Sequence, residues 1–486
     1  MEVPRAMEMY IGVDIGTTAV KTIVYNSDAK KIEMDVSQSY EAFSKGHGQF
    51  EQDPRQIERA VFETLKQVSK SFTNVRAIVL DSALHTVMLL NGDLEPLSNV
   101  IPWLDERSVD HVKKVISDNQ LSKHLHLKTG CPPDTVYPLY KLLWIKQNEK
   151  DMLNSASKIV SLKDYVIYKL TGDLVSDIGV ASGSGYMDIE KKVWCEELLK
   201  DFLEISSEKL PQLVSPKTVL RLSKEAAKIT GLPEGLPVVV GISDAAASSI
   251  GAGAFVENSI TISVGSSAAI RAVLNHPVKQ YPVSSIWCYV LDENHYISGA
   301  AIKNGGYVFD WYVKLFCCYD HETIVKKVEE NLNFLDEKPV LFYPFIFGKR
   351  FPEFDPSPRA KFDNLTSTTT QEQVARSVLE GIAFNLKRAF DVVKTIPDSL
   401  EKVFATGGLT RATVWMKMLS AILNHPILVQ SKRQGAALGT ILYFLSKGDL
   451  HSIGGYLSNN EVEIFRPDRS LFEYYSKLYR MWVENF

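Results

Sequence analysis

A strand, a glycine turn and a pair of hydroxyl residues occur together twice in this chain, once near its start and once just past its middle. The first copy runs from Tyr10 to Thr18 and leads into an apolar strand at Val20 to Tyr25. The second copy runs from Ser259 to Ser267 and leads into a strand at Ala268 to Leu274. Both copies have the strand–turn–strand pattern of a β-hairpin. The repeat predicts a duplicated fold with a boundary near residue 250.

The segments between and after the hairpins alternate between helical and strand patterns. Asp53-Pro54 is a typical helix start, with Asp as the N-cap and Pro at the first helical position. Further predicted elements are a strand at Val75 to Leu80, helices at Gln371 to Val393, Thr410 to Leu423 and Gln434 to Lys447, and strands at Lys402 to Ala405 and His425 to Gln430. This alternation predicts an α/β fold. Because no linker rich in Pro or Ser separates the two copies, we expect the halves to share a helix or an interface.

The composition excludes several classes of protein. The 486 residues include 54 Lys and Arg against 58 Asp and Glu, a net charge of −4 that does not suit a broad nucleic-acid-binding surface. No apolar run reaches the roughly 18 residues of a membrane span, and Met1 to Glu8 lack the apolar core of a secretory signal. Five cysteines without metal-ligand or disulfide spacing indicate a reducing compartment, and we expect a cytoplasmic protein. A homodimer is our working expectation for its assembly.

Three glycine turns suggest a site for phosphate groups. Asp14 precedes Gly16-Thr17-Thr18 in the first hairpin, Gly265-Ser266-Ser267 forms the second turn, and Thr406-Gly407-Gly408 ends a later strand. Backbone N–H groups in such turns can bind phosphate oxygens, and glycine allows close approach. Asp14 is a plausible Mg²⁺ ligand through water. Each turn alone could be an ordinary hairpin, but the matched pair with a late Gly-Gly favours a nucleotide site.

The set of turns resembles that of the actin–hexokinase superfamily and, within it, the FGGY carbohydrate kinases. The resemblance extends from Met9 to Lys447 and includes two stretches similar to the family's signatures, Tyr137 to Ile145 and Ala360 to Glu380. It implies two ribonuclease H-like (actin-like ATPase) domains, residues 1–252 and 253–486, with the active site in the cleft between them. The chain departs from the family pattern at Lys349, Asn364, Lys417 and Ala421, which affects expected contacts on the adenosine side.

The resemblance assigns roles to the polar residues of these motifs. Asp244 follows the strand at Val238 to Gly241 and could simply cap a helix, but the matching residue of the family is the general base. ATP and Mg²⁺ are the implied cofactors, with Asp14 and Asp244 at the metal. The implied ATP-binding residues are Gly16, Thr17, Thr18, Lys21, Gly265, Ser266, Ser267, Gly407 and Gly408. Lys21 could instead face solvent.

The expected substrate is a small sugar or sugar acid. The matching His of sugar kinases binds a substrate hydroxyl, so the resemblance implies that Leu84 and His85 contact the sugar. Asp105, from a Trp-x-Asp-x-Arg stretch, is a second expected contact, although it could form a structural ion pair. Lys163 and Asp164 lie at a predicted helix start near the expected cleft. Lys163 is our first choice to bind a substrate carboxylate, with pairing to a nearby Asp or Glu as the alternative.

Among the branches of the family, the chain most resembles gluconate kinases, through Ser82 to His85, Ser161 to Tyr165 and Ala269 to Arg271. We therefore expect phosphorylation of D-gluconate to 6-phosphogluconate, with D-xylulose, or another ketose or polyol, as the alternative substrate. A non-catalytic sugar- or nucleotide-sensing regulator and an actin- or chaperone-like ATPase are the competing functions. Both Asp14 and Asp244 are present, which disfavours the regulator.

Overall fold

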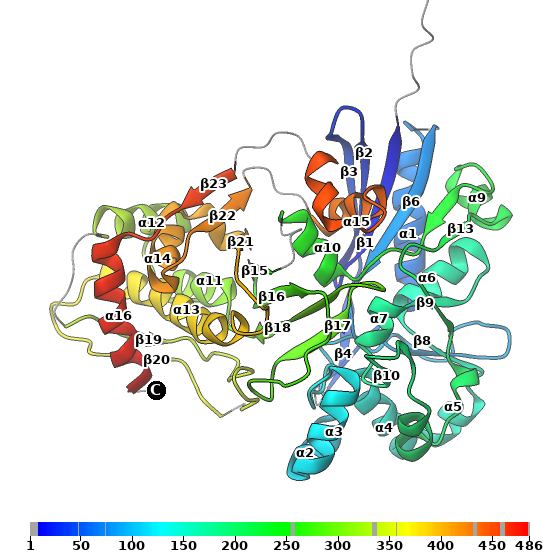
Figure 1. Ribbon diagram of the computed structural model, residues 1–486, viewed down its shortest axis with the longest axis horizontal. Helices are drawn as coiled ribbons and strands as arrows, with labels where there is room; N and C mark the ends of the chain where they lie inside the picture. The colour runs from blue at the N-terminus through cyan, green and yellow to red at the C-terminus, as the bar shows by residue number, and fades with distance from the viewer. Residues whose placement is uncertain are drawn as a thin grey trace, which may run out of the picture.

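Two sheets, one in each half of the chain, organise the computed structural model, which describes residues 8–46, 48–72, 74–253, 258–332, 338–355, 357–430, 435–456 and 462–484 (Figure 1). The predicted α/β class with two related units is confirmed. Gln434, the predicted start of the last helix of the repeat, lies outside the described residues. No helix within the described ranges is both long and apolar enough to cross a membrane.

The N-terminal sheet has six described strands. Their order is β13 (Val219–Arg221), β14 (Pro237–Val239), β6 (Val75–Ser82), β1 (Met9–Ile15), β2 (Ala19–Asn26) and β3 (Lys31–Ser39). Strands β1, β2 and β3 form an antiparallel meander, while β6 lies parallel to β1 and β14 lies parallel to β6. The hairpin predicted at the start of the chain is therefore β1–β2.

The C-terminal sheet repeats this topology. Its order is β17 (Trp287–Val290), β18 (Tyr296–Ile302), β16 (Ala268–Leu274), β15 (Ser259–Val264), β21 (Lys402–Gly407), β22 (Ile427–Gln430) and β23 (Val462–Phe465). A meander of β15, β16 and β18 is followed by β21 and β22, which run parallel to β15, and β17 adds a further strand at the edge. The strand β15 thus corresponds to β1, and β21 corresponds to β6.

The central strands of the N-terminal sheet are buried on both faces, which explains their nearly continuous apolar sequences. In β1, Ile11 and Val13 belong to a core cluster with α1 (Pro54–Ser69), α6 (Leu162–Thr171) and α9 (Lys224–Thr230). Tyr10 belongs to a cluster on the other face, with α10 (Asp244–Gly251) and α15 (Ala436–Leu445). Helix α1 begins after the N-cap Asp53, as predicted.

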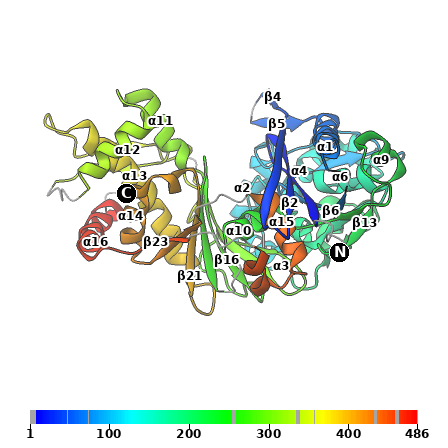
Figure 2. The ribbon, with the colours of Figure 1, turned by 90° about the horizontal axis from the view of Figure 1, so that it is seen from above.

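Five helices of the C-terminal half cover its sheet on the side away from the N-terminal half (Figures 1 and 2). They are α11 (Gly306–Phe316), α12 (His321–Glu330), α13 (Gln371–Val393), α14 (Thr413–Leu423) and α16 (Arg469–Glu484). Helix α13 has the predicted bounds, and its N-terminus carries a capping box formed by Thr370 and Gln373. Its aromatic and aliphatic face packs in the largest of the core clusters formed by the described residues.

Helix α15 belongs to the second half of the chain but packs on the first sheet, against β1, β2 and β6 and across α10 (Figure 1). Glycines permit this close packing. A Cβ atom on Gly12 would lie 2.2 Å from the Ala437 carbonyl oxygen, and one on Gly439 would lie 1.9 Å from the Ala247 carbonyl oxygen. Because α10 and α15 follow the equivalent strands β14 and β22, the two halves interlock through one pair of related helices. This is the shared interface that we expected because no linker rich in Pro or Ser separates the two copies.

A helical insertion between β7 (Met88–Leu90) and β8 (Lys158–Val160) extends the N-terminal half. It contains α2 (Val109–Ser117), α3 (Asn119–Thr129), α4 (Pro138–Asn148) and α5 (Lys150–Ser155). The loops at its start and between α3 and α4 carry residues that line the cavity described next.

Candidate active site between the two halves

A cavity of about 580 Å³ lies between the two halves. The N-terminal half contributes Leu84, His85 and Asp244 to its lining, and the C-terminal half contributes Ser266 and Ser267, all of them predicted site residues. The cavity therefore brings the predicted base, the predicted sugar contacts and the second glycine turn to one place.

Asp244 is the first residue of α10 and lines this cavity. It is not the helix cap, because the Ser243 hydroxyl takes that role and accepts a hydrogen bond from Ala246 N at 3.4 Å. Burial raises the pKa of Asp244 to about 7, and the charge of Asp14 adds to this effect, while the charge of Arg271 opposes it. A carboxyl group with this pKa can exchange a proton near neutral pH.

Asp14 and Asp81 form a second acidic feature beside Asp244. They lie directly opposite each other in the parallel pair β1–β6, near the carboxyl ends of both strands. Asp81 is completely buried, with its carboxyl group beside that of Asp14. Burial and the charges of Asp14 and Asp244 raise its pKa well above the usual range, and burial raises that of Asp14.

Asp81 was not among the predicted site residues, although a sequence signal for it exists. Neighbouring parallel strands that both end in Asp bring the two carboxylates to the same edge of the sheet. The mutual repulsion of these carboxylates and Asp244 suits a divalent cation. Within the described ranges, no three His, Cys, Asp or Glu side chains gather closely enough to hold a metal by themselves. A cation here would keep several of its waters, as Mg²⁺ commonly does.

The first glycine turn is held by polar contacts from the N-terminal half. The Gly16 carbonyl accepts a hydrogen bond from the Tyr40 hydroxyl, and the Thr17 carbonyl accepts one from Gln52 Nε2 at 2.6 Å. Thr17 Oγ1 accepts a hydrogen bond from the indole N–H of Trp103 at 2.9 Å, and Trp103 lines the cavity. The turn is thereby tied to the cavity wall.

Thr18 immediately precedes β2, the strand that leaves this turn, and Lys21 is the third residue of that strand. Lys21 is exposed and pairs with Asp14 across the β1–β2 ladder, where its charge counteracts the rise in the pKa of Asp14. The Thr18 carbonyl accepts a backbone hydrogen bond from Tyr40 at 3.0 Å, which further fixes the turn. Lys21 therefore acts on the acidic group from the solvent side.

Two further glycine segments converge on the second turn. Gly407 pairs with Val264 in the parallel ladder, has φ of 107°, and would place a Cβ atom 2.2 Å from the Val264 carbonyl oxygen. Only glycine fits this position without strain. Gly408 follows at once, and Gly306 N donates to the Gly265 carbonyl at 2.7 Å. The Gly305-Gly306 pair before α11 was missed as part of this arrangement, although two glycines before a helix are a recognisable signal.

His85 faces the cavity as a neutral ring. Its Nδ1 lies 2.8 Å from the Gly183 carbonyl oxygen, which can only accept, so Nδ1 carries the proton and Nε2 is an acceptor. Burial lowers the pKa of His85 to about 3, which keeps the imidazole neutral at physiological pH. Nε2 lies 3.5 Å from the Tyr289 hydroxyl, and both groups line the cavity. His85 can therefore accept a hydrogen bond from a hydroxyl compound.

The prediction that Lys163 binds a substrate carboxylate is not supported by its surroundings. The side chain is completely buried and does not line the cavity. Its ammonium group donates to Asp177 Oδ2 at 2.9 Å and to the carbonyls of Gly241 and Ile242 at 2.8 and 2.9 Å. All three donors are used, so the alternative, pairing with a nearby Asp, describes its role.

Asp105 and Asp164 are also structural in this arrangement. Asp105 accepts hydrogen bonds from Phe50 N at 2.7 Å and Arg107 Nε at 2.9 Å and lies outside the cavity lining, as the ion-pair alternative proposed. Asp164 forms a capping box at the start of α6 with Ser161. Burial raises its pKa to about 7.

Two arginines in the cavity were not assigned a role from the sequence. Arg350 lines the cavity and its Nε forms an ion pair with Asp134 Oδ2 at 2.9 Å. Arg271 lines the cavity from β16. Both arginines lie in stretches that resemble the family. Their position in the cavity, however, follows only from the fold.

The four departures from the family pattern do not line this cavity. Asn364 has φ of 63°, a left-handed conformation that Asn tolerates where the family has Gly. Lys417 forms an ion pair with Glu329 at 3.0 Å, Lys349 pairs with Glu353 at 3.0 Å, and Ala421 is buried in α14.

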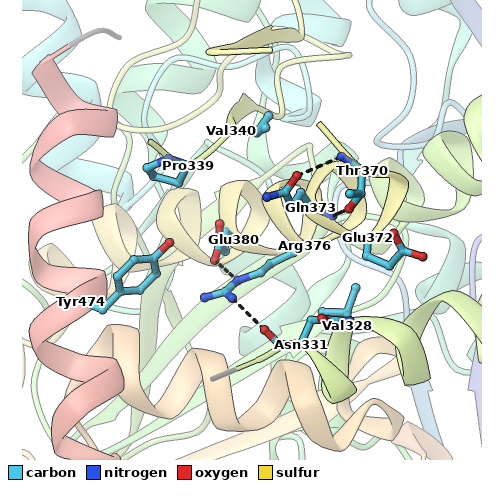
Figure 3. Close-up of a pocket in the computed structure, with 10 residues that line it drawn as sticks. All are labelled: Val328, Asn331, Pro339, Val340, Thr370, Glu372, Gln373, Arg376, Glu380 and Tyr474. Carbon is cyan, nitrogen blue, oxygen red and sulfur yellow. Dashed lines mark hydrogen bonds and ion pairs between the residues drawn. The ribbon is translucent and has the colours of Figure 1, made fainter. Parts of the chain in front are cut away.

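A second cavity, of about 320 Å³, lies in the C-terminal half between α12, α13 and α16 (Figure 3). Its polar side chains interact with one another. Arg376 Nε donates to Glu380 Oε1 at 2.8 Å, and Thr370 and Gln373 bond in the capping box of α13. The polar groups that line this second cavity therefore already bond to one another within the fold. The cavity between the halves, which is lined by the predicted site residues, is our candidate active site.

Comparison with known proteins agrees with this arrangement. Residues 9–251 match the N-terminal domain of the FGGY family of carbohydrate kinases, and residues 260–445 match its C-terminal domain. The gluconokinase of Bacillus subtilis (strain 168) is 29% identical over 457 residues, which cover 91% of this chain and 88% of that protein.

Solved structures give the same result. The crystal structure of gluconate kinase from Lactobacillus acidophilus has a TM-score of 0.92 and 30% identity, covering 99% of this chain and 98% of that one. A ligand-bound xylulose kinase from the same organism has a TM-score of 0.91 and 29% identity, with coverage of 99% and 98%.

Proposed function

Since the chain belongs to the FGGY family of carbohydrate kinases, and is therefore a phosphotransferase with an alcohol group as acceptor, we propose that it transfers the γ-phosphate of MgATP to the terminal hydroxyl of D-gluconate. The product is 6-phosphogluconate. The observation that carries this proposal is the position of Asp244, a carboxyl group with a pKa of about 7 in a cavity lined by both halves.

Asp244 is the general base in this proposal. It accepts the proton of the attacking hydroxyl while the O–P bond to the γ-phosphorus forms and the bond to the leaving ADP oxygen breaks. Phosphoryl transfer depends mainly on alignment and on stabilisation of charge. A base whose pKa lies near the working pH is suited to the proton transfer. His85 orients the sugar by accepting a hydrogen bond at Nε2, beside Leu84.

The glycine turns bind the nucleotide. Backbone N–H groups and hydroxyls of the first turn, Gly16 to Thr18, and of the second, Gly265 to Ser267, would hold phosphate oxygens as charge develops on them. Gly407 and Gly408 would provide a flat backbone surface for the adenosine. Gly306, which donates to Gly265, supports the second turn from behind.

Asp14 and Asp244, with Asp81 beside them, would hold Mg²⁺ through its waters. The ion, when bound, neutralises phosphate charge and the repulsion among these carboxylates. The raised pKa values of Asp14 and Asp81 support a cation here, because both carboxylates are buried close to other negative charges. Lys21 lies nearby as a solvent-side countercharge.

Gluconate is proposed as the acceptor because a gluconokinase and a gluconate kinase are among the most similar proteins found. D-xylulose is the alternative, favoured by the almost equal similarity to a xylulose kinase. We further propose domains at residues 1–252 and 253–486, since this division lies between the two sheets and between the two matched ranges.

A coupled assay of MgATP consumption tests the acceptor. D-gluconate, D-xylulose, L-ribulose, glycerol and L-fuculose would be compared at equal concentrations. Turnover on gluconate with little on the others supports the proposal. Turnover on xylulose instead replaces the acceptor but leaves the base. No turnover on any sugar, with MgATP still bound in a titration, would favour a regulator.

A further inference from the structure

Arg271 lies in the cavity with most of its hydrogen-bonding capacity unused. Its Nη1 donates to Ser263 Oγ at 2.8 Å, and its Nε is buried without a hydrogen-bond partner among the described residues. A guanidinium group has five N–H donors and cannot lose its charge at physiological pH. Burying the Nε–H donor without a partner is costly. The arrangement therefore suits a ligand that accepts hydrogen bonds from Arg271.

The other cations in or beside the cavity have carboxylate partners in the protein. Arg350 pairs with Asp134 at 2.9 Å, and Lys303 lies 3.5 Å from Glu106. Arg271 forms no ion pair with any residue in the described part of the chain, although the charge of Asp244 is close enough to influence it. Unlike Arg350 and Lys303, Arg271 thus lines the cavity without an ion-pair partner among the described residues.

The position of Arg271 on β16 directs it to the acceptor side of the cavity. Ala269, two residues earlier on the same face of the strand, also lines the cavity, as does Trp287 on β17. Register places Arg271 opposite Gly299 of β18, and Gly299 opposite Trp287. Tyr289, also on β17, lines the same cavity, as does His85 from the N-terminal half. A ligand held by His85 can therefore reach Arg271.

We propose that Arg271 binds the carboxylate of a sugar-acid substrate and so selects aldonates over neutral sugars and polyols. Arginine pairs with carboxylates through two parallel hydrogen bonds, which gives geometric selectivity as well as charge neutralisation. This role replaces the one that the sequence suggested for Lys163. The inference rests on the proposed function, because it concerns the acceptor of that same reaction.

The test compares D-gluconate with D-glucitol, which has a hydroxymethyl group in place of the carboxylate. Binding of each compound would be measured by calorimetry, and kcat and KM by the coupled assay, for wild type, Arg271→Gln and Arg271→Lys. Arg271→Gln is expected to weaken gluconate binding about 10- to 100-fold, with little change for glucitol. Arg271→Lys should lie between, since it keeps the charge but loses the planar pair of donors.

Lys303→Gln is the matched control, because it removes a positive charge that Glu106 already partners in the same cavity. Its effect on gluconate should be several-fold smaller than that of Arg271→Gln. Equal losses for the two variants would mean that the cavity acts through its overall charge and would overturn the inference.

Two other results would also overturn it. Arg271→Gln could raise KM for MgATP while gluconate binding stays unchanged, which would assign Arg271 to a phosphate group. It could also reduce turnover of every acceptor equally. Both results leave the proposed function intact if wild type phosphorylates gluconate. If wild type instead phosphorylates only neutral sugars, the gluconate proposal fails first, and the inference fails with it. Should Arg271→Gln not fold, Arg271→Lys and the gluconate–glucitol pair on wild type still decide.

Discussion

The indole N–H of Trp103 donates a hydrogen bond of 2.9 Å to the hydroxyl of Thr17. Trp103 lines the cavity between the halves, and Thr17 lies in the first glycine turn. One side chain therefore joins the wall of this cavity to the turn expected to bind phosphate.

Replacement of Trp103 by Phe tests this link. The ring stays in the cavity wall, but the donor to Thr17 is lost, at a cost of about 0.5–1.5 kcal/mol. We expect KM for MgATP to rise roughly 2- to 10-fold, measured at saturating acceptor. Trp194→Phe is the control, because its indole donates a comparable 2.9 Å hydrogen bond, to Pro211, away from this cavity. An unchanged KM in Trp103→Phe would contradict the link.

The pKa of Asp244 predicts how the rate depends on pH. A base acts only when deprotonated. As the pH rises toward about 7, kcat/KM should therefore increase about tenfold per pH unit, and above pH 7 it should level off. Asp244→Asn should lower kcat by about 10²- to 10⁴-fold and abolish this dependence. MgATP binding, measured by calorimetry, should weaken far less than kcat falls, because Asp14 still holds the ion. A variant that keeps the wild-type profile would exclude Asp244 as the base.

The local elements were predicted well because their information is local. The hairpin β1–β2 follows from apolar strands on either side of Gly16-Thr17-Thr18, and α13 matches Gln371–Val393 because a capping box and a regular apolar face define it. The duplicated topology followed from the repeat of one such pattern. Asp244 was identified by family resemblance rather than by its own local sequence, which by itself favours a helix cap.

The remainder depends on contacts between distant segments. Sequence alone did not show that α15 packs on β1, because that contact requires Gly12 and Gly439 to meet backbone from the other half. It also did not show that the ammonium group of Lys163 donates all of its hydrogen bonds to Asp177 and to the carbonyls of residues 241 and 242. Arg271 reached the cavity through the register of β16, which no motif specifies.

Asp81 should destabilise the protein in the absence of a cation. The pKa of Asp81 is raised in the folded state. At pH values above the usual pKa of an Asp, the folded protein therefore binds more protons than the unfolded protein does. The contribution of Asp81 to stability is therefore greatest at low pH and falls as pH rises from about 4 toward the raised pKa. Asp81→Asn should raise Tm at pH 8 by about 2–4 °C for each kcal/mol recovered, with a smaller gain at pH 5.

The exposed Asp173 provides the control for this variant. Asp173→Asn removes the same charge from the surface and should leave Tm nearly unchanged at both pH values. Differential scanning calorimetry without Mg²⁺ measures both. A lower Tm for Asp81→Asn at pH 8 would mean that the charge of Asp81 has a stabilising partner.

Lys163→Met should affect stability and leave substrate preference unchanged. Removing one member of a buried ion pair leaves Asp177 charged and uncompensated, at a cost of about 3–5 kcal/mol. The double variant Lys163→Met/Asp177→Asn should recover part of this, because Asn keeps the oxygen that accepts from Val180 N. Urea unfolding measures the stability. A stable Lys163→Met that selectively loses gluconate would restore the original assignment of Lys163.

The crossing of α10 and α15 predicts coupling between packing and catalysis. A Cβ atom on Gly439 would lie 1.9 Å from the Ala247 carbonyl oxygen, so Gly439→Ala must move one helix away from the other. Because α10 begins with Asp244, this shift displaces the proposed base. We expect a loss of about 1–3 kcal/mol in stability from overpacking, together with a lower kcat at unchanged KM for MgATP. Gly454→Ala is the control, since a Cβ atom there has no neighbour within 4 Å. A Gly439→Ala protein that loses stability but keeps full kcat would show that the crossing supports the fold without positioning Asp244.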